Sequence, residues 1–517
     1  MCGFAGVLGG SQRINKEALK LMTDRVIHRG PDSSGQWFDE KDNIFLGHRR
    51  LSILDVSSRG SQPMSSQNGR YILAFNGEIY NHLEIRKSLE KNINIKWTGS
   101  SDTETLVMSF QILGIQNTIR AARGMFAMSV WDRKKKCLSL IRDRIGEKPL
   151  YYGWQNKDRN SSFLFGSELK SLKTHPSFLG KISRKAVLDY LKNKSVTGED
   201  SIYENIYKVS PGFIITIDSN SKNIDKYQYW SMEETIKRAK ESEFIDTEDN
   251  ISKLLESTIN DAVKEQMISD VPIGAFLSGG IDSSTIVALM QKNTSSPVKT
   301  FAIGFEDKDF DEAIYAKDVA NYLGTDHTEL YVSSDDALKV IPKLSNIYDE
   351  PFSDSSQIPT FLVSELASKH VKVSLSGDSG DELFCGYNRY TDTEKFWNRI
   401  SFLPKNLRRS LYKVVNNNEL HLIKKINSFL GSKVSEDKIQ KGINLLPSNS
   451  KLEFYRRFIT HHWYESNQIV LNTDINLEDK KKYFDLPGAN FQEMMMIHDL
   501  MYYLVDDILT KVDRASM

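Results

Sequence analysis

Residues 276–284 read FLSGGIDSS, between an apolar run at 271–277 that predicts a strand and a run at 285–290 typical of a helix start. Two glycines and three serines favour a tight strand-to-helix turn, which brings backbone N–H groups and small hydroxyls to a helix N-terminus. Such a turn stabilises an anion, and a phosphate can approach a backbone that lacks side chains. Asp282 would repel that anion unless a cation lay between them, so we interpret it as a Mg²⁺ ligand.

Two other phosphate-binding loops are excluded for this turn. No Gly-Lys-Ser/Thr follows it, as a Walker A loop requires, and no G-x-G-x-x-G dinucleotide fingerprint is present. An ordinary Gly/Ser turn in an α/β domain stays the alternative. The full run resembles the pyrophosphate loop of ATP pyrophosphatases, which cleave ATP to AMP and pyrophosphate. The resemblance implies ATP contacts from Leu277, Ser278, Gly279, Gly280, Asp282, Ser283 and Ser284.

The composition bounds the class of protein. A chain of 517 residues predicts two or three domains, and 39% hydrophobic residues are enough for real cores. Lys+Arg and Asp+Glu both number 68, so the net charge of +0 argues against a nucleic-acid partner bound by bulk charge. Three cysteines fit a reducing cytosol better than a disulfide framework. The start has no signal-peptide pattern and no apolar run reaches about 18 residues, so we expect a cytoplasmic protein without a membrane partner.

Residues 1–230 predict layered β-sheets flanked by helices. Short apolar runs indicate strands, and two stretches with helical spacing intervene, at 83–89 and 104–113. Cys2 is informative because removal of Met1 would make it the N-terminus. Its own α-amine, with an ordinary pKa of about 7.7–8.0, could then take the thiol proton. Taken alone, Cys2 is more simply an inert second residue.

Five motifs in this half change that balance. They are MCGFAG at 1–6, HRGPDSSG at 28–35, RRLSILD at 49–55, FNGEIYN at 75–81 and SSDTE at 100–104. The series resembles class II glutamine amidotransferase domains, which are N-terminal nucleophile hydrolases with an αββα sandwich. The resemblance implies that Cys2 attacks the side-chain amide of glutamine, and that the Asn76 side chain and the Gly77 backbone N–H stabilise the oxyanion.

The same resemblance implies how free glutamine is held. Arg50 pairs with the α-carboxylate, since a guanidinium donates two parallel hydrogen bonds, and Asp102 pairs with the α-ammonium. The pocket is lined by Leu51, Ile53, Asn76, Gly77 and Glu78. Because the Cys2 amine supplies the base, we expect His28 and His48 to be structural.

Residues 251–517 predict a second domain, joined to the first by a polar linker at 231–250. Apolar residues at helical spacing from 251 to 267 indicate an amphipathic helix, and strands then alternate with helices up to residue 375. This order predicts an α/β domain with a parallel sheet, with helices on both faces and ligands beyond the carboxyl ends of the strands.

A second motif, LSGDSGDELFCGY at 375–387, stands at such a strand end. It resembles the asparagine synthetase pattern S-G-E-G-x-D-E-x-F-G-G-Y. The resemblance implies ATP contacts from Ser376 and Gly377, an adenosine contact from Ile303, and a Mg²⁺ ion shared by Asp282 and Asp381. An acidic loop beside a helix N-terminus is the alternative.

The chain departs from this family pattern in three places. Asp378, whose family equivalent assists the attack of ammonia, stands where many members carry Glu, and Cys385 stands where Gly is usual. Residues 349–357 lack an Arg that some aspartate-amidating members carry, which leaves the acceptor open. Residues 391–490 match no known pattern and predict a helical elaboration. The run at 506–517 continues further in the family, so we expect a synthetase domain incomplete at its C-terminus.

Together the resemblances imply a glutamine- and ATP-dependent ligase. It would amidate a carboxylate, by expectation aspartate to asparagine, through an acyl-adenylate and transferred ammonia, releasing AMP and pyrophosphate. A sugar acid in surface-polysaccharide synthesis is an alternative acceptor. A truncated interaction protein with glutaminase activity alone is the alternative from a different class. The lining of the ammonia path and a homodimer are left open by the sequence.

Overall fold

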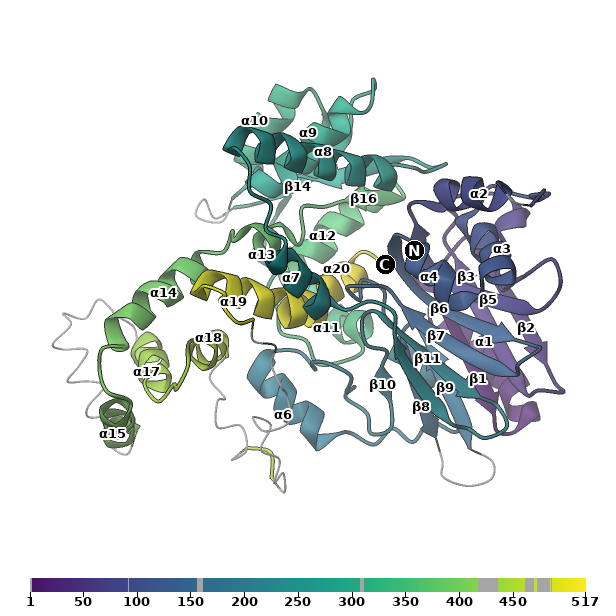
Figure 1. Cartoon of the computed structure of the whole chain (residues 1–517), viewed down its shortest axis with the longest axis horizontal. Coiled ribbons are helices and arrows are strands. Elements are labelled where there is room, and N and C mark those ends of the chain that lie inside the picture. The colour runs from purple at the N-terminus through teal and green to yellow at the C-terminus, as the bar shows by residue number, and fades with distance from the viewer. Residues whose placement is uncertain are drawn as a thin grey trace. The chain divides into compact units, whose positions relative to one another are not determined.

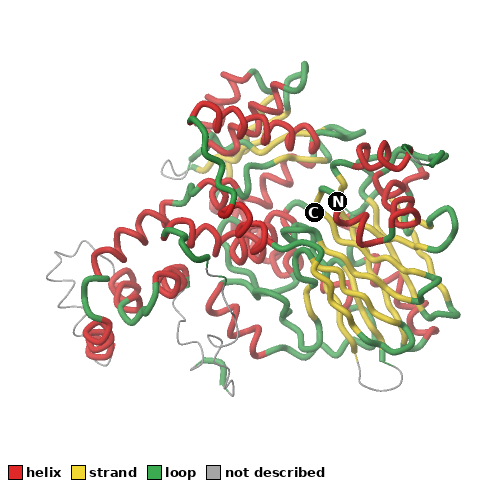
Figure 2. Tube along the Cα trace, viewed as in Figure 1, coloured by secondary structure: helices red, strands yellow, loops and turns green. Residues whose placement is uncertain are grey.

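The computed structural model describes the chain except residues 1 and 92, the ranges 156–160, 307–310, 417–435, 461–468 and 472–483, and residue 485. The chain divides into two compact units. The first contains Met1–Ser183, Gly198–Asp378 and Val505–Met517, and the second contains Arg184–Thr197 and Ser379–Leu504. The sheets belong to the first unit, whereas the described part of the second is helical (Figures 1 and 2).

Two six-stranded sheets, in which all neighbouring strands are antiparallel, open the first unit. One has the order β10-β8-β9-β1-β3-β2, with β1 at Gly3–Gly9, β2 at Ser33–Asp39, β3 at Ile44–Arg50, β8 at Tyr151–Gln155, β9 at Ser162–Gly166 and β10 at Tyr207–Lys208. The other has the order β12-β11-β7-β6-β5-β4, with β4 at Met64–Ser65, β5 at Tyr71–Ile79, β6 at Gly124–Asp132, β7 at Cys137–Arg142, β11 at Phe213–Asp218 and β12 at Ile224–Gln228.

These two sheets pack face to face. One core cluster joins Phe4, Leu46 and Phe165 of the first sheet to Ile72, Trp131 and Leu140 of the second. The alternate residues Tyr71, Leu73 and Phe75 pack instead against α2 (His82–Glu90), α3 (Asp102–Leu113) and α4 (Ile115–Ala121). Helices α1 (Gln12–Asp24) and α5 (Leu169–Lys173) pack on the first sheet. The predicted αββα sandwich is therefore confirmed.

A four-stranded parallel sheet with the order β15-β14-β13-β16 follows. Its strands are β13 at Ile273–Phe276, β14 at Lys299–Phe305, β15 at Asp326–Val332 and β16 at Val373–Leu375. One core cluster packs α8 (Glu248–Gln266), α9 (Ile281–Lys292) and α10 (Ala313–Leu323) on the sheet, and two others use α11 (Ser334–Tyr348) and α12 (Gln357–Ser368). Gly324 ends α10 at φ +70, in the left-handed conformation that favours glycine. The predicted parallel α/β sheet is confirmed.

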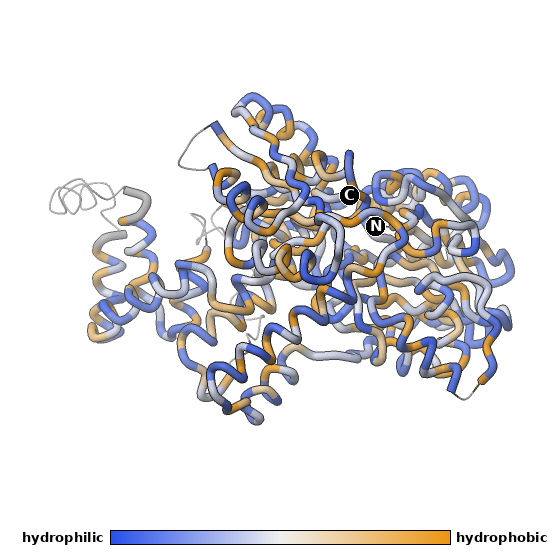
Figure 3. Tube along the Cα trace, turned by 90° about the horizontal axis from the view of Figure 1, so that it is seen from above, coloured by the Kyte–Doolittle hydropathy of each residue, from blue (hydrophilic) through white to orange (hydrophobic). Residues whose placement is uncertain are grey.

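The second unit contains α6 (Arg184–Asn193), α13 (Gly380–Phe384), α14 (Asn388–Ile400), α15 (Lys405–Asn416), α17 (Glu436–Leu445), α18 (Lys451–Ile459) and α19 (Phe491–His498). Its core joins aromatic residues such as Tyr390, Phe454 and Phe491. Hydrophilic and hydrophobic segments alternate along most helices, as expected where each helix buries one face (Figure 3). The described part of 391–490 is thus helical, as predicted, and the rest of that range lies outside the described residues.

The segment at 231–250 holds α7 (Met232–Glu241) and the first turn of α8. The apolar residues expected to bury the N-terminal half of α8 lie exposed: Ile251, Leu254 and Leu255. Its C-terminal half does reach the core, where Val263 is buried. Among the residues described, no helix is long and apolar enough to cross a bilayer.

Candidate active site

Cys2 immediately precedes β1, the fourth strand of its sheet. Its side chain is buried, and the thiol donates to the Leu51 carbonyl oxygen over 3.7 Å. Burial raises the pKa of this thiol, while the charge of Arg50 opposes that rise. The carbonyl oxygen of Cys2 accepts a hydrogen bond from Arg29 Nε at 3.0 Å, so the backbone of this residue is held as well.

Asn76 and Gly77 lie near the C-terminal end of β5. Strand alternation puts Asn76 on the same face as Ile72 and Ala74, between the two sheets. Its amide is fully buried, and both the Nδ2 and Oδ1 atoms lack a hydrogen-bond partner among the described residues. A buried polar group without a partner is costly, so this amide is suited to a ligand atom that completes it. Gly77 has φ +152, and a Cβ there would lie 2.1 Å from the Met125 carbonyl oxygen.

Two buried carboxyl groups, Asp102 and Glu78, lie at the C-terminal end of β5. Asp102 begins α3 and accepts hydrogen bonds from the Ile79 and Thr103 N–H groups at 2.9 and 2.7 Å. Burial raises the pKa of Asp102 to about 6, and burial together with the charge of Asp102 raises the pKa of Glu78 to about 8. The Oε1 atom of Glu78 is buried without a partner among the described residues. A bound cation such as an α-ammonium would relieve both groups.

Arg50 makes hydrogen bonds within the protein that the sequence analysis did not predict. Its guanidinium donates to the carbonyl oxygens of Ser57 at 2.8 Å and Leu54 at 3.1 Å, and also to that of Asp55. The residue therefore holds the loop that carries Leu51 and Ile53, both of which are half-buried. Its role in binding glutamine stays a prediction.

His28 and His48, the two histidines predicted to be structural, both contact other groups of the protein. His48 is buried and its Nε2 lies 2.9 Å from the Phe75 carbonyl oxygen, and burial lowers its pKa to about 4. His28 Nε2 lies 3.0 Å from Glu168. Both contacts fit the structural roles expected from the sequence.

The loop after β13 is folded on itself. The Ser278 N–H and hydroxyl lie 3.2 and 3.0 Å from the Ser283 hydroxyl, which donates to the Gly280 carbonyl oxygen at 3.2 Å. Gly279 has φ +78, and a Cβ there would lie 2.6 Å from the side chain of Tyr315. Leu277 is buried, while the Ser284 hydroxyl is buried and unpartnered among the described residues. The predicted strand–turn–helix is therefore present, with α9 beginning at Ile281.

The loop after β16 meets this first loop. A Cβ at Gly377 would lie 2.7 Å from the Ser283 nitrogen and 2.9 Å from the Asp282 carbonyl carbon. The segment Ser376–Asp378 is thus packed against the turn through Gly377. The sequence had suggested this meeting only because each motif follows a strand of one parallel sheet. Ile303 is half-buried on β14, the strand next to β13.

The donor set fits a Mg²⁺ ion that takes further oxygen ligands from phosphates. The carboxylate of Asp282 is half-buried in the first turn of α9 and has no protein partner in the described chain. No cluster of three His, Cys, Asp or Glu residues within the described ranges could hold a metal alone. A single carboxylate with phosphate oxygens is the arrangement that Mg²⁺ favours. Asp381 lies on α13 in the second unit, and its share in this ion stays a prediction.

Two charged residues on α20 (Leu509–Ala515) were not among the predicted site residues. Lys511 Nζ lies 4.0 Å from Asp378 and 3.9 Å from Asp354. Asp513, two residues further along the same helix, binds Arg29. The run at 506–517 was visible in the sequence, but nothing in its spacing identifies these partners.

The comparisons with known proteins identify a family for each half of the chain. The glutamine amidotransferase domain family matches residues 1–230, and the asparagine synthase family matches residues 254–517. A Methanocaldococcus jannaschii protein assigned as a glutamine-hydrolysing asparagine synthetase is 36% identical, over 100% of this chain and 98% of its own length. Asparagine synthetase 1 of Bacillus subtilis is 32% identical, over 100% of this chain and 78% of its own. The chain therefore belongs to the family of glutamine-hydrolysing asparagine synthetases, and it is a ligase.

Proposed function

We propose that this protein hydrolyses glutamine at Cys2 and uses the ammonia to amidate a carboxylate that it activates with ATP, with aspartate as the expected acceptor. The observation that carries the proposal is the fully buried amide of Asn76, which has no partner among the described residues. A buried polar group without a protein partner is costly, and a bound ligand atom would complete its hydrogen bonds. Between the two sheets, where Cys2 also lies, that atom is the oxyanion of an attacked amide.

In the first reaction the Cys2 sulfur attacks the amide carbon of glutamine. Its proton passes to the α-amine that Met1 removal exposes, and the carbonyl oxygen becomes an oxyanion held by the Asn76 amide and the Gly77 N–H. Ammonia leaves, and water then cleaves the thioester to give glutamate. Asp102 and Glu78 would hold the α-ammonium, which favours their ionised forms.

In the second reaction an acceptor carboxylate oxygen attacks the α-phosphorus of ATP, and pyrophosphate leaves. The loops at 277–284 and 376–378 would hold the phosphates through backbone N–H groups and serine hydroxyls. A Mg²⁺ ion held by Asp282, and in our prediction by Asp381, would neutralise charge on the phosphates. Ammonia then attacks the acyl carbon, and AMP leaves. Asp378 is the carboxylate proposed to take a proton from ammonia.

Lys511 is a candidate for binding the acceptor. Residues 349–357 carry no Arg, and Lys511 is a buried cation beside Asp378. It could pair with a second carboxylate of the acceptor, which aspartate has.

The acceptor is tested by measuring glutamine- and ATP-dependent pyrophosphate release with a panel of carboxylic acids. We expect release with aspartate and formation of asparagine. Release with another acid, such as a sugar acid, but none with aspartate would overturn the aspartate assignment. Glutamine hydrolysis without pyrophosphate release for any acid would instead support the glutaminase-only alternative. Intact mass is a separate check, because retention of Met1 would contradict the role of the Cys2 amine.

A further inference from the structure

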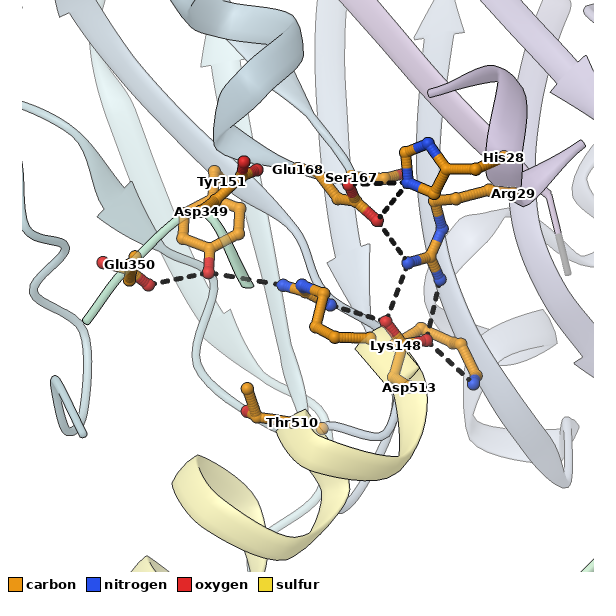
Figure 4. Close-up of polar contacts among 12 residues, drawn as sticks. His28, Arg29, Lys148, Tyr151, Ser167, Glu168, Asp349, Glu350, Thr510 and Asp513 are labelled. Atoms are coloured by element: carbon orange, nitrogen blue, oxygen red, sulfur yellow. Dashed lines mark hydrogen bonds and ion pairs between the residues drawn. The ribbon is translucent and has the colours of Figure 1, made fainter. Parts of the chain in front are cut away.

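Arg29 is a fully buried cation in contact with the backbone of Cys2. It ends the short helix η1 (Ile27–Arg29), and its Nε donates to the Cys2 carbonyl oxygen at 3.0 Å. Its Nη1 donates to Glu168 at 2.7 Å. Its two Nη atoms also bind both carboxylate oxygens of Asp513, at 2.8 and 2.7 Å. Figure 4 shows Arg29 between Glu168 and Asp513.

Asp513 lies 484 residues away in the sequence, on α20 (Leu509–Ala515). Its side chain is buried and also accepts from Lys148 Nζ at 3.2 Å and from Arg514 at 2.5 Å. Burial alone would favour the neutral acid, but the charges of Arg29, Lys148 and Arg514 hold the pKa of this carboxyl well below its usual range. Asp513 is therefore a fixed anion surrounded by cations.

The geometry of the two carboxylates gives them different effects on Arg29. Glu168 takes a single donor and is shared with His28 and Lys170. Asp513 takes the two-pronged edge of the guanidinium, and a bidentate pair fixes the plane and rotation of that group. Because Nε belongs to the same rigid plane, the direction of its hydrogen bond to Cys2 depends on where Asp513 stands.

We propose that Asp513 is a positioning residue of the glutaminase site, which orients Arg29 and through it the backbone of Cys2. The proposal rests on the proposed role of Cys2 as nucleophile. The same helix carries Lys511 beside Asp378, so one short element connects the nucleophile to the loop after β16. A shift of the Cys2 backbone would displace the thiol and, after Met1 removal, the amine that serves as its base.

The test compares Asp513→Asn with Asp506→Asn in the full-length protein. Asp506 is a matched control, because it is also buried on the C-terminal segment and binds Lys208 Nζ at 3.1 Å and the Gly198 N–H at 2.8 Å. Asp506 has no contact with Arg29. We expect Asp513→Asn to lower kcat for glutamate release by about 10- to 100-fold, with KM for glutamine changed less than about twofold. Asp506→Asn should keep the wild-type kcat.

A second readout reports on the nucleophile itself. Iodoacetamide alkylates accessible thiolates, and mass spectrometry separates Cys2 from Cys137 and Cys385. We expect Asp513→Asn to change the pH dependence of alkylation at Cys2 alone. An unchanged profile at Cys2 would overturn the proposal. So would equal losses in Asp513→Asn and Asp506→Asn, or a fall in kcat matched by a rise in KM, since those outcomes indicate general structural damage.

If Asp513→Asn does not fold, Asp513→Glu replaces it, with Asp506→Glu as its control. The longer side chain keeps the charge but must displace the guanidinium of Arg29. We expect kcat to fall about three- to tenfold with KM unchanged, and wild-type kcat in folded Asp513→Glu would overturn the proposal. Cys2→Ala is assayed in parallel. Glutamate release that survives Cys2→Ala shows that the proposed function has failed, whereas loss in Cys2→Ala with full activity in Asp513→Asn shows that only the positioning role has failed.

Discussion

The proposed glutamine pocket around Asn76 and the proposed phosphate-binding turn after β13 differ in how far their polar groups are removed from water. In the pocket, Asn76 is 0% exposed, Asp102 5% and Glu78 8%, so polar groups are already out of water before glutamine binds. In the turn, Ile281 is 85% exposed, and the hydroxyls of Ser278 and Ser283 bind each other. If the proposed roles hold, the pocket is organised for charge that develops during a reaction, whereas the turn offers donors to a ligand that is already charged. Variants of the pocket should change kcat and stability, and variants of the turn should change the use of ATP.

The largest effect is expected at the nucleophile. Cys2→Ala should lower glutamate release by more than about 10⁴-fold, because no other group in the pocket can form the thioester. Amide synthesis from added ammonia and ATP should stay near wild type. Glutaminase assays and ammonia-dependent pyrophosphate release measure the two activities. Parallel loss of both would contradict the separation of the two reactions.

The second-largest effect tests whether the unpartnered side-chain amide of Asn76 stabilises the oxyanion. Asn76→Ala should lower kcat for glutamate release by about 10²- to 10³-fold with little change in KM, because its N–H acts on the oxyanion. Asn81→Ala is the matched control, since that buried amide already binds the Ala121 carbonyl oxygen and the Arg123 N–H. It should lower the melting temperature and leave kcat unchanged. A rise in KM alone for Asn76→Ala would place that amide in substrate binding.

The turn is tested by Asp282→Asn, which removes the charge and keeps the shape. We expect ATP–pyrophosphate exchange to fall by about 10²-fold and glutamate release to persist, because the two sites use separate residues. Asp335→Asn is the control, since that carboxylate also lies in the first turn of a helix, α11, but belongs to neither loop. Exchange at the wild-type rate in Asp282→Asn would exclude that residue as a metal ligand.

The smallest effect concerns the pH dependence of stability. The pKa of Glu78 is about 8 in the folded protein against 4.5 ordinarily, so the folded state binds more protons between these values. The free energy of unfolding therefore falls as pH rises through that window. Glu78→Gln removes this loss and should raise the melting temperature by about 2–4 °C at pH 8.5, with a smaller gain at pH 5.5.

The control for that measurement is Glu104→Gln. Glu104 is equally buried, but its carboxylate accepts hydrogen bonds from the Thr98 and Gly99 N–H groups at 2.7 and 2.9 Å. The side-chain amide of a glutamine has one acceptor oxygen and cannot replace both carboxylate oxygens of Glu104. The melting temperature of Glu104→Gln should therefore fall at both pH values. A gain for Glu78→Gln that is the same at pH 5.5 and 8.5 would exclude a titrating Glu78 as its cause.

The sequence by itself determined the local elements and the chemistry they carry. The continuous apolar run at 71–75 predicted a strand. Because successive side chains of a strand point to opposite faces, such a run buries both of them: Ile72 and Ala74 lie in one core, and Tyr71, Leu73 and Phe75 in another. The glycines and serines of 277–284 predicted a turn because few other residues allow φ +78 at Gly279 against a neighbouring helix. These signals depend on residues close together in the sequence, so a single sequence is enough to predict the strand and the turn.

Only the tertiary structure decided which distant groups meet. Helical spacing predicted one buried face along α8, yet Ile251 and Leu254 are exposed, because a periodic pattern does not say where a packing partner ends. Arg50 was predicted to pair with a carboxylate, and nothing in the sequence indicated that it also binds carbonyl oxygens of its own loop. Arg29 and Asp513 are separated by 484 residues in the sequence and pair in the folded unit. A buried charge without an opposite charge beside it is costly, but the sequence does not show which residue supplies that partner.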